Sequence, residues 1–182
     1  MLVPSSNPTE LSDAVIEIVN AGARIINLSL GLSTSSLTTY PNLREAYDYA
    51  RKQGAIIVAA SGNQGDIGRI SLIHNEWIIP VAACNEYGVL EPMANFGASM
   101  GRRGLMAPGT SITSTYAGGG YVQMSGTSFA AFVTGAIALL WSLFPNATPA
   151  EIINSIIRVA AFNRRSIIPP LLNVEAAWNK LK

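Results

Sequence analysis

The stretch Met124-Ser125-Gly126-Thr127-Ser128-Phe129-Ala130-Ala131 stands directly ahead of an apolar, helix-like run over residues 132–140. Gly126 lets the backbone turn sharply, and Ser128 follows it at the expected start of a helix. Free N–H groups and the positive end of the helix dipole lie at such a start, where they stabilise a developing oxyanion. This stretch therefore has the features of a turn that presents a serine nucleophile. The alternative is an ordinary serine at the start of a helix.

Outward from this turn, apolar strands alternate with amphipathic helices. Near-continuous apolar runs predict buried strands, and Asn or Thr caps, Pro at the first turn and Gly at the end predict helices. Such strands are typical of a parallel sheet that is covered on both faces. We therefore predict an α/β fold, a three-layer sandwich with a mostly parallel sheet flanked by helices. The expected strands cover residues 25–30, 55–60 and 77–83, and the expected helices begin at Asn7-Pro8, Pro41, Ser128, Thr148-Pro149 and Asn173.

Five motifs stand in one order along the chain. They are Ile25-Ile26-Asn27-Leu28-Ser29-Leu30-Gly31, Val58-Ala59-Ala60-Ser61-Gly62-Asn63-Gln64-Gly65, Ala94-Asn95-Phe96-Gly97, Met106-Ala107-Pro108-Gly109 and the serine turn. In this order the chain resembles the C-terminal portion of the catalytic domain of the subtilisin-like serine peptidases, the subtilases. The resemblance covers residues 11–160. We expect a single domain over residues 1–182, with its core in 11–160 and a C-terminal tail in 161–182.

The resemblance implies a serine endopeptidase that cuts peptide bonds through an acyl-enzyme on Ser128. It implies that the side chain of Asn63 donates to the oxyanion. An amide suits that task because it donates a hydrogen bond without carrying charge. Without the resemblance, Asn63 would be an ordinary turn residue in Gly-Asn-Gln-Gly.

The resemblance also implies where a substrate binds. Ser29, Leu30 and Gly31 would pair with an extended peptide as an added strand does. The opposite wall of the first specificity pocket would be formed by Ala60-Ser61-Gly62. Small residues in that wall and the uncharged Gln64 at its rim favour an apolar or neutral side chain before the cut.

Two features depart from the family pattern. The family order is Asp, His, Ser, yet the sequence holds one histidine, His74, at a place where the family has no base. We expect His74 to lie on a surface or substrate loop. In addition, the run from Ser128 to Gly135 is one residue shorter than the family pattern and lacks its proline. One residue rotates a helix by about 100°, so the difference must be absorbed near Ser128.

The missing acid and base leave several functions open. An N-terminal subtilase fragment would supply Asp and His as a partner, and the isolated chain would be inactive or very weak. A non-catalytic peptide-binding module and an inactive truncated subtilase are the alternatives. An α/β-hydrolase esterase fits less well, because Gly126-Thr127-Ser128-Phe129-Ala130 lacks the second glycine of that fold's elbow. In the resembling fold, the strand that carries the acid lies beside the strand that matches residues 25–30. Without that neighbour, residues 25–30 would be an open, apolar sheet edge, which Leu2-Val3 or a second chain would fill.

The composition argues against a nucleic-acid-binding protein. The net charge is +1 and 13% of the residues are charged, with no basic stripe for nucleic acid. Cys84 is expected to be a small buried hydrophobe. No motif calls for a cofactor or a metal ion, and Gly118-Gly119-Gly120 is read as a turn. No membrane span or signal peptide is visible, which favours the cytoplasm while leaving the compartment open.

Overall fold

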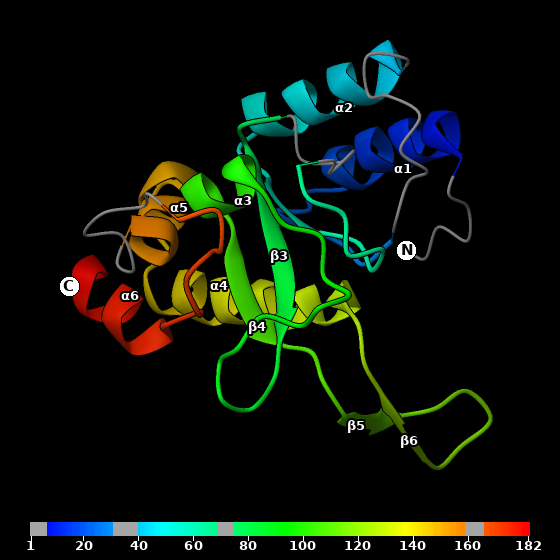
Figure 1. Cartoon of the computed structure of the whole chain (residues 1–182). Helices are drawn as coiled ribbons and strands as arrows, with labels where there is room; N and C mark the ends of the chain where they lie inside the picture. Colours follow the sequence, from blue (N-terminus) through cyan, green and yellow to red (C-terminus); the bar gives the residue numbers. More distant parts are fainter. Residues whose placement is uncertain (1–6, 31–39, 69–74, 159–165) are drawn as a thin grey trace.

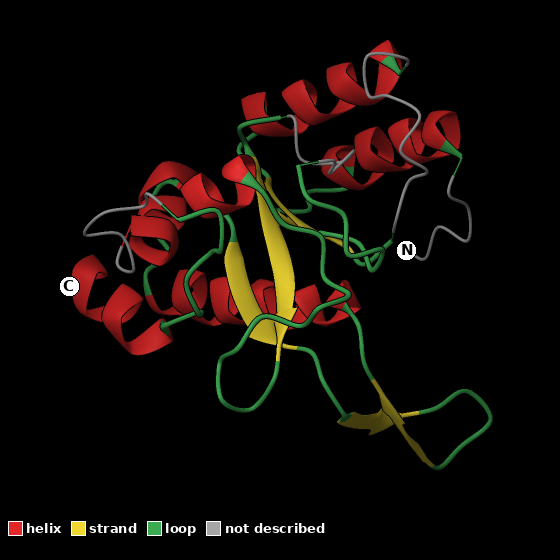
Figure 2. Cartoon of the chain, viewed as in Figure 1, coloured by secondary structure: helices red, strands yellow, loops and turns green. Residues whose placement is uncertain are grey.

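The computed structural model describes residues 7–30, 40–68, 75–158 and 166–182. The predictions for Leu2-Val3, Gly31 and His74 lie outside these residues. Figure 2 shows which parts of the chain form helices, strands and loops. The helices are α1 (Pro8–Asn20), α2 (Pro41–Lys52), α3 (Ala98–Arg103), α4 (Ala131–Leu143), α5 (Pro149–Arg158) and α6 (Val174–Leu181), and the strands are β1 (Ile25–Leu28), β2 (Ile56–Ala60), β3 (Ile78–Cys84), β4 (Leu105–Pro108), β5 (Ile112–Thr115) and β6 (Tyr121–Met124).

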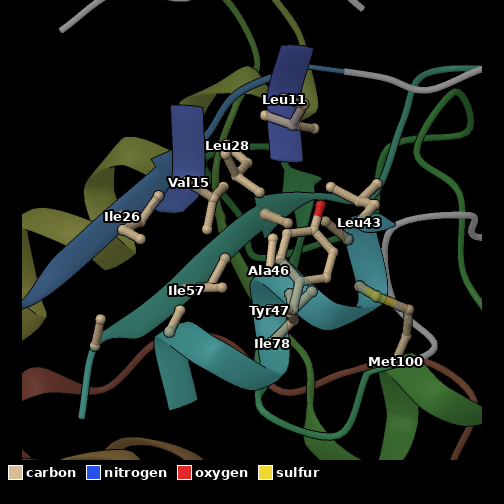
Figure 3. Packing of buried hydrophobic residues seen from close by; sticks show 14 of the residues in the cluster. Leu11, Val15, Ile26, Leu28, Leu43, Ala46, Tyr47, Ile57, Ile78 and Met100 are labelled. Atoms are coloured by element: carbon tan, nitrogen blue, oxygen red, sulfur yellow. The ribbon is translucent and has the colours of Figure 1, made fainter. Parts of the chain in front are cut away.

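A four-stranded parallel sheet in the order β1-β2-β3-β4 forms the middle layer. Helices α1 and α2 cover one face, and α4, α5 and α6 cover the other (Figure 1). Successive residues of β2 point to opposite faces. Ile57 packs in the first core cluster, between the sheet and helices α1 and α2, and Ile56 packs in the second, between the sheet and helices α4, α5 and α6. Figure 3 shows the first cluster, in which Leu43 and Tyr47 of α2 pack against the sheet. The predicted α/β sandwich is confirmed.

Helix starts follow their sequence signals. The side chain of Asn7 accepts a hydrogen bond from the Thr9 N–H and caps α1. Thr148 and Glu151 form a reciprocal capping box at α5, in which the Thr148 N–H donates to Glu151 Oε2 at 2.7 Å and the Glu151 N–H donates to Thr148 Oγ1 at 3.3 Å. Asn173 caps α6. These polar caps fix where each helix begins.

The first strand differs from its prediction. β1 ends at Leu28, two residues early, and it is only half-buried, with Asn27 exposed. The reason is its place at the sheet edge: among the described residues β2 is its sole strand neighbour. The open edge expected beside residues 25–30 is therefore present in the described part of the chain.

The structure also contains a strand, a short helix and a hairpin that the sequence did not predict, or predicted only in part. Strand β4 and the short helix α3 were missed. The segment ahead of the serine turn forms an antiparallel hairpin, β5–β6, that projects from the body (Figure 1). The predicted turn at residues 118–120 is its tip, where all three glycines have positive φ. Within the described residues no helix is both long and apolar enough to cross a bilayer.

Candidate active site

The candidate residues gather where the parallel strands end. Ser29 follows β1, Asn63 follows β2, and Ser128 lies in a 3-10 turn, Thr127–Ala130, that leads into α4. The carboxyl ends of parallel strands share one edge of a sheet, which is where α/β proteins place their sites. The 3-10 turn lies where we expected the shortened helix start to be absorbed, and α4 proper begins at Ala131.

The loop after β2 is held by Asn95, which is 3% exposed. Its Nδ2 donates to the Ser61 carbonyl at 3.0 Å and to Gln64 Oε1 at 2.9 Å. Its Oδ1 accepts from the N–H groups of Gln64 at 3.1 Å and Asp66 at 2.9 Å. Gly62 has a φ of +100°, and a Cβ there would lie 2.4 Å from Asn95 Nδ2. The sequence marked the Asn95 motif only as a landmark; its role in shaping the Asn63 loop was missed.

Asn63 is tied to the serine turn through its oxygen. Asn63 Oδ1 accepts from both the N–H and the Oγ1 of Thr127, each at 2.9 Å. Thr127 Oγ1 in turn accepts from the Gly62 N–H at 3.1 Å. Since the oxygen is engaged, the amide plane is fixed and Nδ2 is the free end. No hydrogen bond of that Nδ2 occurs among the described residues.

Two donors flank the space beside Gly126. A Cβ built on Gly126 would lie 3.2 Å from Asn63 Nδ2 and 3.8 Å from the Ser128 nitrogen. A tetrahedral oxyanion requires donors of this kind, a side-chain amide and a backbone N–H, close to one small space. The absence of a side chain at Gly126 keeps that space clear. Both Asn63 and Ser128 are solvent-exposed, so a substrate can reach them.

Ser29 and Ser128 contact each other directly. Ser29 Oγ donates to the Ser128 carbonyl at 2.6 Å, and Ser128 Oγ donates to the Ser29 carbonyl at 3.4 Å. The second bond is long and therefore weak. Among the described residues no hydrogen bond joins the Ser128 hydroxyl to a titratable side chain, whereas an acyl-transfer nucleophile needs a base to activate it.

The expected pocket wall is only partly open. Ala60 and Ser61 are 4% and 3% exposed, whereas Gly62 is half-buried and Leu30 is half-buried across the site. At this exposure Ala60 and Ser61 are buried, and the Ser61 backbone is bonded to Val81 and Asn95. The structure thus brings Ser29, Ser61–Asn63 and Ser128 to one edge and leaves their roles in substrate binding as predictions.

Neither Cys84 nor a cluster of metal-binding side chains forms a second site in the part of the chain that the structure describes. Cys84 is buried, as expected, and burial together with the charge of Glu91 raises the pKa of its thiol. A raised pKa keeps the thiol protonated and a poor nucleophile. Within the described ranges no three His, Cys, Asp or Glu side chains are grouped so that they could hold a metal ion.

Comparison with known proteins identifies the class. The model of the subtilase family matches residues 2–175, which is nearly the whole chain. The chain therefore belongs to the subtilase family, as the motif order predicted. Among curated relatives, the thermophilic serine proteinase of Bacillus sp. (strain AK1) is 37% identical over 139 residues, 76% of this chain and 33% of that protein. Subtilisin DY of Bacillus licheniformis is 33% identical over 163 residues, 86% of this chain and 57% of that protein.

Solved structures agree with the fold. The prenylagaramide maturation protease PagA has a TM-score of 0.87 and 28% identity, and the match covers 100% of this chain and 69% of PagA. The patellamide maturation protease PatA has a TM-score of 0.83 and 29% identity, and the match covers 96% of this chain and 69% of PatA. The chain thus spans between a third and somewhat over half of the two curated relatives, and about two thirds of these two structures.

Proposed function

We propose that this chain is the nucleophile-bearing portion of a subtilisin-like serine endopeptidase. The proposal rests on the two hydrogen bonds from Thr127 to Asn63 Oδ1, which leave the amide Nδ2 of Asn63 beside the exposed Ser128. An ordinary serine at a helix start needs no such neighbour. Family membership and this geometry together favour acyl transfer over a merely structural turn.

The proposed chemistry follows from these groups. A base removes the proton of Ser128 Oγ as the oxygen attacks the substrate carbonyl, whose oxygen becomes an oxyanion. Asn63 Nδ2 and the Ser128 N–H donate to that oxyanion. The C–N bond then breaks, the amine leaves with the proton from the base, and an ester remains on Ser128 until water hydrolyses it.

The base and its acid partner are proposed to come from an N-terminal subtilase segment, carried by another chain or by a further part of a longer one. Two surfaces support such a partner. The outer edge of β1 is unpaired in the described structure. Beside it, α4 carries no charged residue, and its outward Phe132, Leu139 and Leu143 are 45%, 66% and 64% exposed. A helix that is apolar all round is normally buried.

The proposed substrate is a peptide or protein in extended conformation. The Ser29 carbonyl and the half-buried Leu30 lie beside the nucleophile at the end of an edge strand, where a peptide can add as a strand. PagA and PatA, which the chain resembles in structure, are maturation proteases. We therefore propose a peptide precursor, with an apolar or neutral residue before the cut.

The test is peptide hydrolysis by the chain mixed with a segment from the upstream reading frame that carries the family's Asp and His motifs. We expect cleavage only in the mixture, none with Ser128→Ala, and a kcat about 10²–10³ lower with Asn63→Ala, a range that comes from the same donor in a subtilisin. Cleavage that survives Ser128→Ala would refute the proposal. Peptide binding without cleavage in every mixture would instead favour the non-catalytic module, an alternative that the single histidine of the sequence supports.

A further inference from the structure

Three polar side chains form a directed chain of hydrogen bonds that ends on the backbone of Ser128. Thr134 Oγ1 on α4 donates to Asn27 Oδ1 at 2.9 Å, and Asn27 Nδ2 donates to Ser29 Oγ at 2.7 Å. Ser29 Oγ, which accepts this bond with one lone pair, donates its own proton to the Ser128 carbonyl at 2.6 Å. Residues that are 99 and 107 positions apart in sequence are thereby linked.

The geometry points to Thr134, Asn27 and Ser29 as positioning residues for the Ser128 nucleophile, an inference that rests on the proposed function. We name these three side chains the relay. No hydrogen bond joins Thr134 or Asn27 to Ser128 among the described residues, and the shortest hydrogen-bonded route from the Thr134 hydroxyl to Ser128 runs through Asn27 and Ser29.

The relay completes a clamp on both sides of Ser128. On the N-terminal side, Asn63 Oδ1 holds the Thr127 N–H. On the C-terminal side, Ser29 Oγ holds the Ser128 carbonyl. These bonds hold the Gly126–Thr127 peptide group ahead of Ser128 and the Ser128–Phe129 peptide group after it, which limits how the Cα–Cβ bond of Ser128 can turn. A displacement of about 1 Å at a reacting group can cost a hundredfold in rate, so the direction of that bond matters for attack.

Each link of the relay has one polarity. The Thr134 hydroxyl can also donate to the Ala130 carbonyl, but that distance is 3.4 Å against 2.9 Å to Asn27 Oδ1. The shorter bond is the stronger one. Because Asn27 Oδ1 accepts from Thr134, its NH₂ end must face Ser29, which leaves the Ser29 proton for Ser128. Loss of the Thr134 hydroxyl therefore removes the constraint that orients the Asn27 amide.

The relay also lies on the open edge of the sheet. Asn27 and Ser29 are exposed on or just after β1, whose outer side has no strand neighbour among the described residues. Hydrogen bonds strengthen when water is excluded from them. A segment that docks along β1 would therefore tighten the relay and align the nucleophile at the moment the base arrives.

The test compares Ser29→Ala, Thr134→Val and Thr134→Ser with wild type in two measurements. In the mixture with the Asp- and His-bearing segment, a fluorophosphonate probe gives kinact and KI for Ser128. We expect kinact to fall about five- to fiftyfold in Ser29→Ala and about three- to tenfold in Thr134→Val, with KI within about twofold. Thr134→Ser, which keeps the hydroxyl, restores kinact to within about twofold of wild type. Ser142→Ala is the control, because its hydroxyl donates to Leu139 on the same helix without reaching β1.

The second measurement is amide hydrogen exchange of the peptide spanning residues 125–133 in the chain alone. It needs no activity, so it separates the two ideas. Faster exchange in Ser29→Ala and Thr134→Val, with residues 149–158 unchanged, is the expected result. Unchanged exchange, or unchanged kinact in the mixture, would overturn the relay. If wild type is never labelled, the proposed function fails, and the exchange result alone decides whether the relay holds the turn.

Discussion

Gly62 is the position at which one added methyl group should disturb the site most. Its φ is +100°, and a Cβ would lie 2.4 Å from Asn95 Nδ2 and 2.8 Å from Gln64 Oε1. Asn95 uses that same Nδ2 to hold the Ser61 carbonyl and the Gln64 side chain. Gly62→Ala therefore strains the backbone and displaces the side chain that shapes the Asn63 loop.

Backbone strain at residue 62 and the displaced hydrogen bonds of Asn95 together set the loss of stability in Gly62→Ala. An L-residue in the left-handed region costs roughly 1–2 kcal/mol, and each of the two displaced hydrogen bonds costs about 1 kcal/mol. The free energy of unfolding should fall by roughly 3–4 kcal/mol. In a domain of this size 1 kcal/mol shifts Tm by about 2–4 °C, so we expect a Tm roughly 6–16 °C lower.

Thermal unfolding followed by circular dichroism measures this change, with Gly22→Ala as the matched control. Gly22 has a φ of +89°, and a Cβ added there would meet nothing within 4 Å, so alanine at this position costs strain alone. We expect Gly22→Ala to lower Tm by about a third to a half as much as Gly62→Ala. In an Asn95→Ala background the cost of Gly62→Ala should fall to that of Gly22→Ala. Equal costs at both glycines in the parent chain would refute the argument.

Three further outcomes are expected. Gly126→Ala puts a methyl group 3.2 Å from Asn63 Nδ2 at a backbone φ of +159°, so fluorophosphonate labelling should slow about a hundredfold, and backbone strain of roughly 1–3 kcal/mol should lower Tm by about 2–12 °C; an unchanged labelling rate would place the oxyanion elsewhere. Hydrogen bonds from Thr148 lower the pKa of Glu151 below its ordinary 4.5, so the ionised carboxylate stabilises the fold above that pH and this stability is lost as the pH falls. The difference in Tm between wild type and Glu151→Gln should therefore shrink on acidification, and a difference that grows in acid would contradict this. Leu139→Glu should leave the Tm of the chain within about 2 °C but weaken binding of the complementing segment at least tenfold in a titration; unchanged affinity would show that α4 stays open.

Much of the fold was predictable because local signals and burial agreed. β2 and β3 are fully buried, so their apolar runs were continuous, and the caps at Asn7 and Thr148 fixed two helix starts. β1 was predicted too long because its edge position, which exposes Asn27, depends on which strands lie beside it. β4 spans four residues and ends at Pro108, and such a short run carries little periodicity.

The candidate site shows the same division. Ser128 and Asn63 were predicted as site residues from motif order, and the structure brings their loops together through Thr127. The tasks of Asn95 and of the Ser29 hydroxyl were not predicted, because they depend on partners 29–34 and 99 residues away. Side-chain bonds of that range arise from the sheet topology and leave no periodic trace in the sequence.

The most direct test of the central claim locates a covalent adduct. The chain is mixed with the Asp- and His-bearing segment, treated with a fluorophosphonate, digested, and mapped by tandem mass spectrometry. The account predicts one phosphonyl group on Ser128, absent from Ser128→Ala and much slower to form in Asn63→Ala. An adduct on another residue, or none in the mixture with the segment shown to be bound, would contradict it.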